Sequence, residues 1–270
     1  MQSRLLVSCP DRPGIVAAVA GFLHGAGANI TSSAQHSGDR FHMRMEFDHD
    51  APLDGFEDVA SRFDMEFSFT RADVPKRVAI FVSREEHCLL DLLWRRRSGE
   101  LRCEVPCVVS NHEVARADVE AFGVPFVHIP NTPDTRAAAE EAMLGAVGGS
   151  VDLVVLARYM QILSGDFLAR VGAPVMNIHH SFLPAFAGAA PYERAHERGV
   201  KVIGATAHYV TEELDAGPIV EQDVERVTHA DDVEALQRIG RDIERSVLAR
   251  AVRWHLEDRV LLDGNRTIVF

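Results

Sequence analysis

The stretch Phe41–Asp48, FHMRMEFD, decides the fold of the first part of the chain because apolar and polar residues alternate strictly along it. This period of two predicts an antiparallel strand with one covered face. Met65–Thr70 repeats the pattern, and Leu5–Cys9 is a further short apolar run. Apolar residues at helical spacing in Ile15–Leu23 and Leu53–Phe63 predict two helices. The order strand, helix, strand, strand, helix, strand predicts a four-stranded sheet with two helices on one side.

A different pattern follows the linker Ala72–Arg77, since short apolar runs now alternate with helical segments. The predicted strands are Val78–Val82, Val105–Val109, Phe126–Ile129, Val151–Leu156 and Pro174–Ile178. The predicted helices are His87–Arg97, Glu113–Phe122, Thr135–Val147 and, near the end, Asp232–Val252, before a closing hairpin at 260–269. Buried parallel strands with helical crossovers accommodate this pattern. We therefore expect two domains, at residues 1–73 and 77–270, and a ligand site beyond the carboxyl ends of the second domain's strands.

The composition excludes several classes of protein. The 28 Lys and Arg residues face 40 Asp and Glu, and this net charge of −12 argues against a nucleic-acid partner, which clustered cations would bind. No apolar run approaches the roughly 20 residues of a membrane span, and the first ten residues lack a signal-peptide layout. We therefore expect a cytoplasmic protein with neither nucleic acid nor membrane as a partner.

Four cysteines, Cys9, Cys88, Cys103 and Cys107, form no C-x-x-C pair. Free thiols packed in the interior are the preferred interpretation, ahead of a zinc site. No metal-binding residues are predicted.

Three polar residues carry the predicted chemistry. Asn177 and His179 follow a predicted strand and, being two apart, point the same way. An amide beside an imidazole suits polarisation of a carbonyl and support of its oxyanion. Asp215 lies in a loop bounded by Gly217 and Pro218, which can deliver a carboxylate to a cleft.

Two other interpretations of these residues stay open. His179, His180 and His208 with Asp215 form a possible set of metal ligands, but no H-x-x-H or H-x-x-E pair on a helix supports it. A serine hydrolase is disfavoured because no G-x-S-x-G elbow surrounds Ser181.

The start of the chain resembles an ACT domain, a small ferredoxin-like regulatory module with βαββαβ order. The residues that carry the resemblance are Cys9–Gly14, the helix that follows them, and Gly27–Ile30. ACT domains often bind amino acids at their mutual interfaces. The resemblance implies an amino-acid effector held by Asp11, Arg12, Gly14 and Asn29, and a homo-oligomer.

The rest of the chain resembles enzymes that use 10-formyltetrahydrofolate. The motifs are Asn177-x-His179, Ser181-x-Leu183-Pro184-x-Phe186-x-Gly188, Ala207-His208-Tyr209-Val210, Leu214-Asp215-x-Gly217-Pro218-Ile219 and the tail Gly264–Ile268. An ACT domain ahead of a Rossmann-like, mostly parallel-sheet formyltransferase domain is similar to the formyltetrahydrofolate deformylase family. The resemblance covers nearly the full chain, although Ala190 stands where a basic residue is expected.

This resemblance implies hydrolysis of 10-formyltetrahydrofolate to formate and tetrahydrofolate, under control of the ACT domain. Asn177 and His179 would stabilise the formyl oxyanion, and Asp215 would activate water, aided by a raised pKa from partial burial. The folate would contact Arg158, Tyr159, Met160, Gln161, Ile162, Leu163 and Leu214. Folate is then the substrate, and no cofactor is expected.

Water is the expected nucleophile because the sequence lacks the features that other acceptors need. A nucleotide acceptor needs a glycine-rich phosphate cradle, but Ser83–Cys88 after the first strand has two acids and no glycine. A tRNA acceptor would favour a basic surface. A formyltransferase to a small amine and a non-catalytic folate or amino-acid sensor remain the alternatives.

Overall fold

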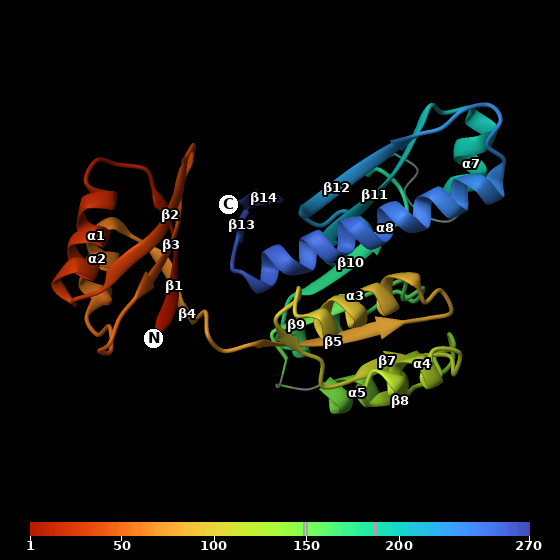
Figure 1. Cartoon of the computed structure of the whole chain (residues 1–270), viewed down its shortest axis with the longest axis horizontal. Coiled ribbons are helices and arrows are strands. Elements are labelled where there is room, and N and C mark those ends of the chain that lie inside the picture. Colours follow the sequence, from red (N-terminus) through yellow and green to blue (C-terminus); the bar gives the residue numbers. More distant parts are fainter. Residues whose placement is uncertain (148, 150, 186–187, 189) are drawn as a thin grey trace. The chain divides into compact units, whose positions relative to one another are not determined.

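The computed structural model describes residues 1–147, 149, 151–185, 188 and 190–270. The chain divides into two compact units, residues 1–75 with 257–270, and residues 76–256 (Figure 1). Among the described residues, no helix is both long enough and apolar enough to span a membrane.

The first unit is built as the sequence predicts. Its elements are β1 (Gln2–Pro10), α1 (Ile15–Gly25), β2 (Asn29–Ser37), β3 (Arg40–Asp48), α2 (Phe56–Phe63) and β4 (Glu66–Arg71). The strands form an antiparallel sheet in the order β2-β3-β1-β4. Both helices cover one face of it (Figure 1), where Phe41, Met43, Met45 and Phe47 are buried against them. The alternation in FHMRMEFD therefore places its apolar face as predicted.

The second face of β3 differs from expectation because it is covered as well. His42 and Arg44, on the polar side of the alternation, are buried. The C-terminal residues lie over them: Arg44 donates hydrogen bonds to the backbone oxygens of Glu257 and Asp258. Asp258 also accepts from Thr70 at 2.8 Å. The predicted closing hairpin, β13 (Val260–Asp263) with β14 (Arg266–Val269), is confirmed.

The tail groups with the first unit. Residues 257–270 form one compact unit with residues 1–75, whereas the predicted second domain spans 77–270. The reason is the set of buried polar contacts just described, which a sequence pattern does not reveal. The boundary near residue 75 agrees with the predicted linker.

The second unit contains the predicted alternation of strands and helices. Its elements are β5 (Lys76–Val82), α3 (His87–Ser98), β6 (Cys103–Glu104), β7 (Val108–Ser110), α4 (Arg116–Ala121), β8 (Phe126–His128), α5 (Arg136–Val147), β9 (Leu153–Leu156), α6 (Gly165–Arg170), β10 (Val175–His179), α7 (Pro191–Arg198), β11 (Val202–Tyr209), β12 (Ile219–Arg226) and α8 (Val233–Leu256). Several predicted segments are shorter than expected: β7 begins at Val108, β9 begins at Leu153, and α4 spans only Arg116–Ala121.

The sheet of this unit is mostly parallel. Its order is β12-β11-β10-β9-β5-β7-β8, with β6 beside β5. The run from β10 through β9, β5 and β7 to β8 is parallel, whereas β10-β11-β12 is antiparallel. Helix α8 packs against β10, β11 and β12 (Figure 1).

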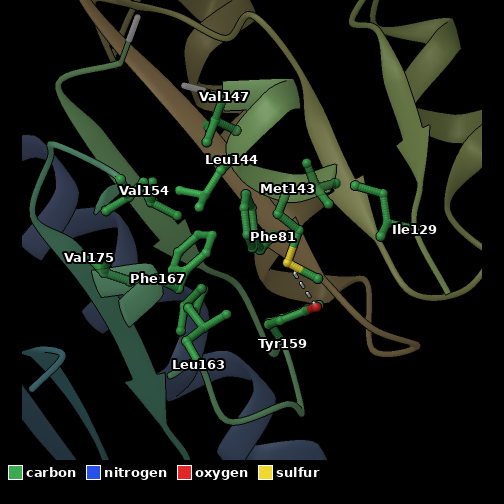
Figure 2. Close-up of a cluster of buried hydrophobic side chains, with 14 of the residues drawn as sticks. Phe81, Ile129, Met143, Leu144, Val147, Val154, Tyr159, Leu163, Phe167 and Val175 are labelled. Carbon is green, nitrogen blue, oxygen red and sulfur yellow. Dashed lines mark hydrogen bonds between the residues drawn. The ribbon is translucent and has the colours of Figure 1, made fainter. Parts of the chain in front are cut away.

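A large apolar cluster fixes the sheet to α5 and α6. Phe81 of β5 lies beside Met143 of α5 and Phe167 of α6, and all three are fully buried (Figure 2). Its neighbours Ile80 and Val82, which alternate to the opposite face, are buried too. Both faces of the central strand are therefore covered, and the carboxyl edge is where polar side chains can meet a ligand.

Candidate active site

A cavity of about 340 Å³ lies at the carboxyl edge of the sheet in the second unit. It is lined by the segment after β9, the end of β10 and the loop between β11 and β12. Every residue predicted to carry the chemistry or to contact the folate is among its lining residues: Arg158, Tyr159, Met160, Gln161, Ile162, Leu163, Asn177, His179, Leu214 and Asp215. The expected ligand site after β9 and β10 is thus present as a cavity.

Asn177 and His179 both reach this cavity from β10, as their two-residue spacing predicts. Across the antiparallel pairing, Asn177 lies opposite His208 of β11. The Asn177 amide nitrogen Nδ2 is 3.3 Å from His208 Nε2. The sequence assigns His208 to a family motif and to a possible set of metal ligands but gives it no catalytic role, and the strand register shows that it is a neighbour of the predicted amide.

The hydrogen bonds of His208 define its protonation. Its Nδ1 lies 3.0 Å from the Tyr209 carbonyl oxygen, which can only accept, so Nδ1 carries a proton. Burial lowers the pKa of His208, which favours the neutral ring. Nε2 is then an acceptor, and Asn177 Nδ2 is its donor. His208 therefore holds the Asn177 side chain in one orientation.

Asp215 enters the cavity on a tightly closed loop. The Tyr209 amide donates to the Pro218 carbonyl at 2.9 Å, which closes the loop at its base. A side chain at Gly217 would collide with the Tyr209 carbonyl oxygen, so glycine is required there. Asp215 itself has a φ of 56°, in the left-handed region. The loop geometry thus delivers the carboxylate that the Gly-Pro boundary predicted.

The Asp215 carboxylate contacts both histidines. Oδ2 lies 3.3 Å from His179 Nδ1, and Oδ1 lies 3.8 Å from His208 Nε2. The hydrogen bond with His179 lowers the pKa of Asp215, and this effect outweighs the opposing effect of burial. The expected raised pKa is therefore wrong. Asp215 therefore stays ionised, and the His179 imidazole is its hydrogen-bond partner.

The segment after β9 divides its side chains between core and cavity rim. Tyr159 and Leu163 are buried in the cluster around Phe81 (Figure 2), whereas Met160 and Ile162 are more than half exposed. Ser83 anchors this segment to the end of β5. Its hydroxyl accepts from the Met160 amide at 3.0 Å and donates to Asn111 Oδ1 at 2.8 Å. The rim therefore presents exposed apolar side chains on a backbone that Ser83 anchors.

Unusual backbone conformations gather around this cavity. Five described residues other than glycine have a positive φ, and three of them, Arg158, Ala190 and Asp215, line it. Such conformations cost about 1–3 kcal/mol each and persist where the surrounding structure imposes them. The clustering supports a functional role for this edge of the sheet.

The alternative interpretations gain no support from the geometry. Burial and the Arg158 cation lower the pKa of His180 to about 3, so this ring is neutral. In the described part of the chain, His179, His180, His208 and Asp215 do not form a convergent group of metal ligands. Ser181 Oγ donates to the Ala185 carbonyl at 2.7 Å, as a turn residue does. Phe186, part of the predicted signature, lies outside the described residues.

The predicted effector residues do not converge within one chain. Asp11, Arg12 and Gly14 follow β1, where Pro10 pairs with Arg40. Asn29 is the first residue of β2 and pairs with Asp48 of β3. Asp48 in turn pairs with Gln2, which lies at the opposite end of β1 from Pro10. Eight residue steps along a strand separate these ends by about 26 Å. In addition, Arg12 is already paired with Asp64 at 3.0 Å.

Comparison with known proteins agrees with the class of enzyme that this fold and site define. The formyl transferase family model matches residues 76–252, and the ACT domain model matches residues 3–58. The glycinamide ribonucleotide transformylase 1 of Symbiobacterium toebii shares the fold of three quarters of this chain, with a TM-score of 0.69 and 31% identity over 96% of its own length. The second unit is therefore a formyl transferase domain, behind an ACT domain.

Full-length relatives define the family more narrowly. The formyltetrahydrofolate deformylase of Mycobacterium bovis is 57% identical over 99% of this chain and 90% of its own length, and that of Bacillus subtilis is 55% identical over 100% and 94%. The crystal structure of a formyltetrahydrofolate deformylase from Pseudomonas syringae superposes with a TM-score of 0.96 at 49% identity, over 100% of this chain and 95% of that one. The chain belongs to the formyltetrahydrofolate deformylase family.

Proposed function

We propose that this chain hydrolyses 10-formyltetrahydrofolate to formate and tetrahydrofolate. The observation that carries the proposal is the convergence of Asn177, His179 and Asp215 on one cavity, in a chain that belongs to the deformylase family. The three side chains come from two segments 36 residues apart or more, so their meeting depends on the fold.

Asn177 and His179 are placed to stabilise the oxygen of the formyl group. His208 occupies one side of the Asn177 amide, and the remaining N–H of that amide can face the cavity. His179 Nε2 is buried and makes no hydrogen bond among the described residues. It can donate to the formyl oxygen when it carries a proton, while Nδ1 faces the Asp215 carboxylate at 3.3 Å.

Asp215 is placed to position and deprotonate the attacking water. Water oxygen bonds to the formyl carbon while its proton passes to the carboxylate, which gives a tetrahedral oxyanion held by Asn177 and His179. The proton held by Asp215 then passes to the folate nitrogen as the bond between this nitrogen and the formyl carbon breaks. Formate and tetrahydrofolate leave, and the carboxylate is regenerated.

The rim of the cavity supports binding of the folate ring system. Met160, Ile162 and Leu214 are exposed apolar side chains there, and contact with a flat ligand would remove them from water. Arg158 and Gln161 add polar groups among the lining residues. In this proposal the folate is the substrate, and the Asn, His and Asp groups carry out the reaction.

Regulation through the ACT domain is part of the proposal. Because Asn29 lies at the opposite end of the sheet from Asp11, Arg12 and Gly14, an effector site using all four requires a second copy of the domain. This supports a homo-oligomer in which effector sites form between copies, with an amino acid as ligand.

The test is formate release from 10-formyltetrahydrofolate without any acceptor, repeated with glycinamide ribonucleotide and with small amines. Stoichiometric formate in the absence of acceptor is the expected result. Formylated acceptor exceeding formate would instead establish a transferase, and folate binding without formate would establish a sensor. Repeating the assay with methionine and with glycine tests the proposed control.

A further inference from the structure

A second group of reactive side chains converges outside the proposed reaction centre. His87 and Cys88 open helix α3, and Glu244 lies on helix α8, 157 positions beyond His87. One ligand atom from each of the three residues lies within 4.8 Å of the others. Cys88 and Glu244 are almost completely buried, and only 12% of the His87 side chain is exposed. An imidazole, a thiol and a carboxylate together in the interior call for a physical explanation.

Their spacing fits donors around one metal ion. Zinc binds such atoms at about 2.0–2.3 Å, so two donors on one ion lie about 3–4 Å apart. His87 Nε2 and Glu244 Oε2 are hydrogen-bonded at 2.8 Å, slightly closer than that range, and the three donor atoms lie within 4.8 Å of one another. A nitrogen, a sulfur and a carboxylate oxygen suit zinc or ferrous iron, rather than the oxygen-only sets of calcium and magnesium.

The surroundings resemble the outer contacts of metal sites. Tyr192 donates from its hydroxyl to Glu244 Oε1 at 2.6 Å, which leaves Oε2 for other partners. Glu85 Oε2 lies 3.9 Å from His87 Nδ1, the ring nitrogen that faces away from Glu244. Carboxylates behind ligating imidazoles and donors behind ligating carboxylates orient the ligands of metal sites. Gly240 allows this arrangement because a side chain there would collide with the Tyr192 hydroxyl.

One nearby cation opposes an ion at this position. Arg158 Nε lies 3.5 Å from Glu244 Oε2. This contact is an ion pair, but Nε and Nη1 of Arg158 are buried and make no hydrogen bond in the described part of the chain, so no hydrogen bond from these two atoms ties up the Glu244 carboxylate. A cavity of about 190 Å³ adjoins the cluster and is lined by Glu85, His87, Tyr192, Arg241 and Glu244, with room for a water molecule as a fourth ligand.

We propose that His87, Cys88 and Glu244 bind one divalent transition-metal ion, zinc or ferrous iron. The site lies next to the reaction centre, since the cavity beside it shares Arg158, His180 and Ala190 with the larger one. It departs from the sequence interpretation, which took Cys88 for an inert buried thiol and expected no metal. Spacing rules miss it because two ligands are adjacent and the third lies on a distant helix.

The first test is the metal content of the full-length protein, purified anaerobically without chelator and measured by mass spectrometry. We expect about one zinc or iron per chain, and a loss of at least about tenfold in metal affinity for Cys88→Ser. Cys107→Ser is the matched control, because Cys107 is also buried in the second unit but lies outside the cluster. It should retain the metal content of the wild type.

A second readout is independent of enzyme activity. Titration of metal-free protein with Co²⁺ should give a thiolate-to-cobalt absorption band in the wild type and in Cys107→Ser, and none in Cys88→Ser. His87→Gln keeps the buried ligands Cys88 and Glu244 and should weaken Co²⁺ binding. This variant therefore tests the metal site if Cys88→Ser fails to fold. A wild type that contains no metal and gives no such band would overturn the proposal. Equal Co²⁺ affinity in His87→Gln and the wild type would also overturn it. Either result would leave formate release, and the proposed function with it, unaffected.

Discussion

The reaction centre and the predicted effector residues are arranged in opposite ways. Asn177, His179 and Asp215 are contributed by distant segments but lie at one cavity, joined through His208. Asp11 and Asn29 are close in sequence but lie at opposite ends of one sheet. The difference teaches that one chain is sufficient for the proposed chemistry, whereas the proposed control needs a partner copy.

The largest effect is expected at the oxyanion side of the reaction centre. His179→Ala should lower kcat by about 10²–10³-fold, because it removes both a donor to the formyl oxygen and the partner of Asp215. Steady-state formate release measures this loss. His128→Ala is the matched control, because His128 lies on the distant strand β8 and contacts Glu113 there instead of the cavity. An unchanged kcat in His179→Ala would remove the imidazole from the mechanism.

The next largest effect is expected on the stability of the protein, at the second face of the ACT sheet, which the C-terminal residues cover. Arg44→Met should lower the free energy of unfolding by about 1.5–3 kcal/mol, because it removes charge-assisted hydrogen bonds to Glu257 and Asp258. Denaturant titration of the full chain measures it. Arg40→Met, in the same strand but with an exposed partner in Glu66, should change stability by less than about 1 kcal/mol. Equal losses in the two variants would contradict a structural role for the tail.

A smaller effect is expected when the orientation of Asn177 is released. His208→Ala should lower kcat by about tenfold to a hundredfold while KM changes little, because the amide loses the acceptor that orients it. His208→Gln offers a side-chain oxygen as an alternative acceptor and should recover part of the loss. A change confined to KM would show that His208 serves binding rather than orientation.

The smallest effect concerns pH. A base with a pKa of 6.5 would be half protonated at that pH, and its rate would be halved. The pKa of Asp215 lies below its ordinary value of 3.8, owing to His179, and that of His208 lies below 6.5, owing to burial. Each group is therefore less than half protonated at pH 6.5, and protonation of either one should lower kcat by less than twofold between about pH 7.5 and 6.5. A fall of twofold or more over this range that is absent from His208→Gln would assign the titration to His208 and contradict its lowered pKa.

Much of the fold could be predicted because hydrophobic periodicity reports directly on which residues are buried. The alternation in Phe41–Asp48 and the apolar runs before Ser83, Ala157 and His179 each correspond to a strand. The wrapping of residues 257–270 over His42 and Arg44 could not be predicted, since it depends on backbone carbonyl acceptors that every sequence possesses.

The residues of the candidate active site could be predicted from the sequence, but the pKa of its carboxylate could not. Spacing and resemblance placed Asn177, His179 and Asp215 at the cavity, yet the pKa of Asp215 depends on a 3.3 Å contact with His179 that only the fold sets. His208 becomes a neighbour of Asn177 through the register of β10 and β11. The cluster of His87, Cys88 and Glu244 similarly needs α3 and α8 side by side.

The most direct measurement is the comparison of folate binding and formate release in Asp215→Asn, which keeps the size of the side chain and removes the proton acceptor. We expect folate affinity near that of the wild type and a fall in turnover of roughly a hundredfold or more. Turnover close to the wild-type rate would contradict a water molecule activated by this carboxylate.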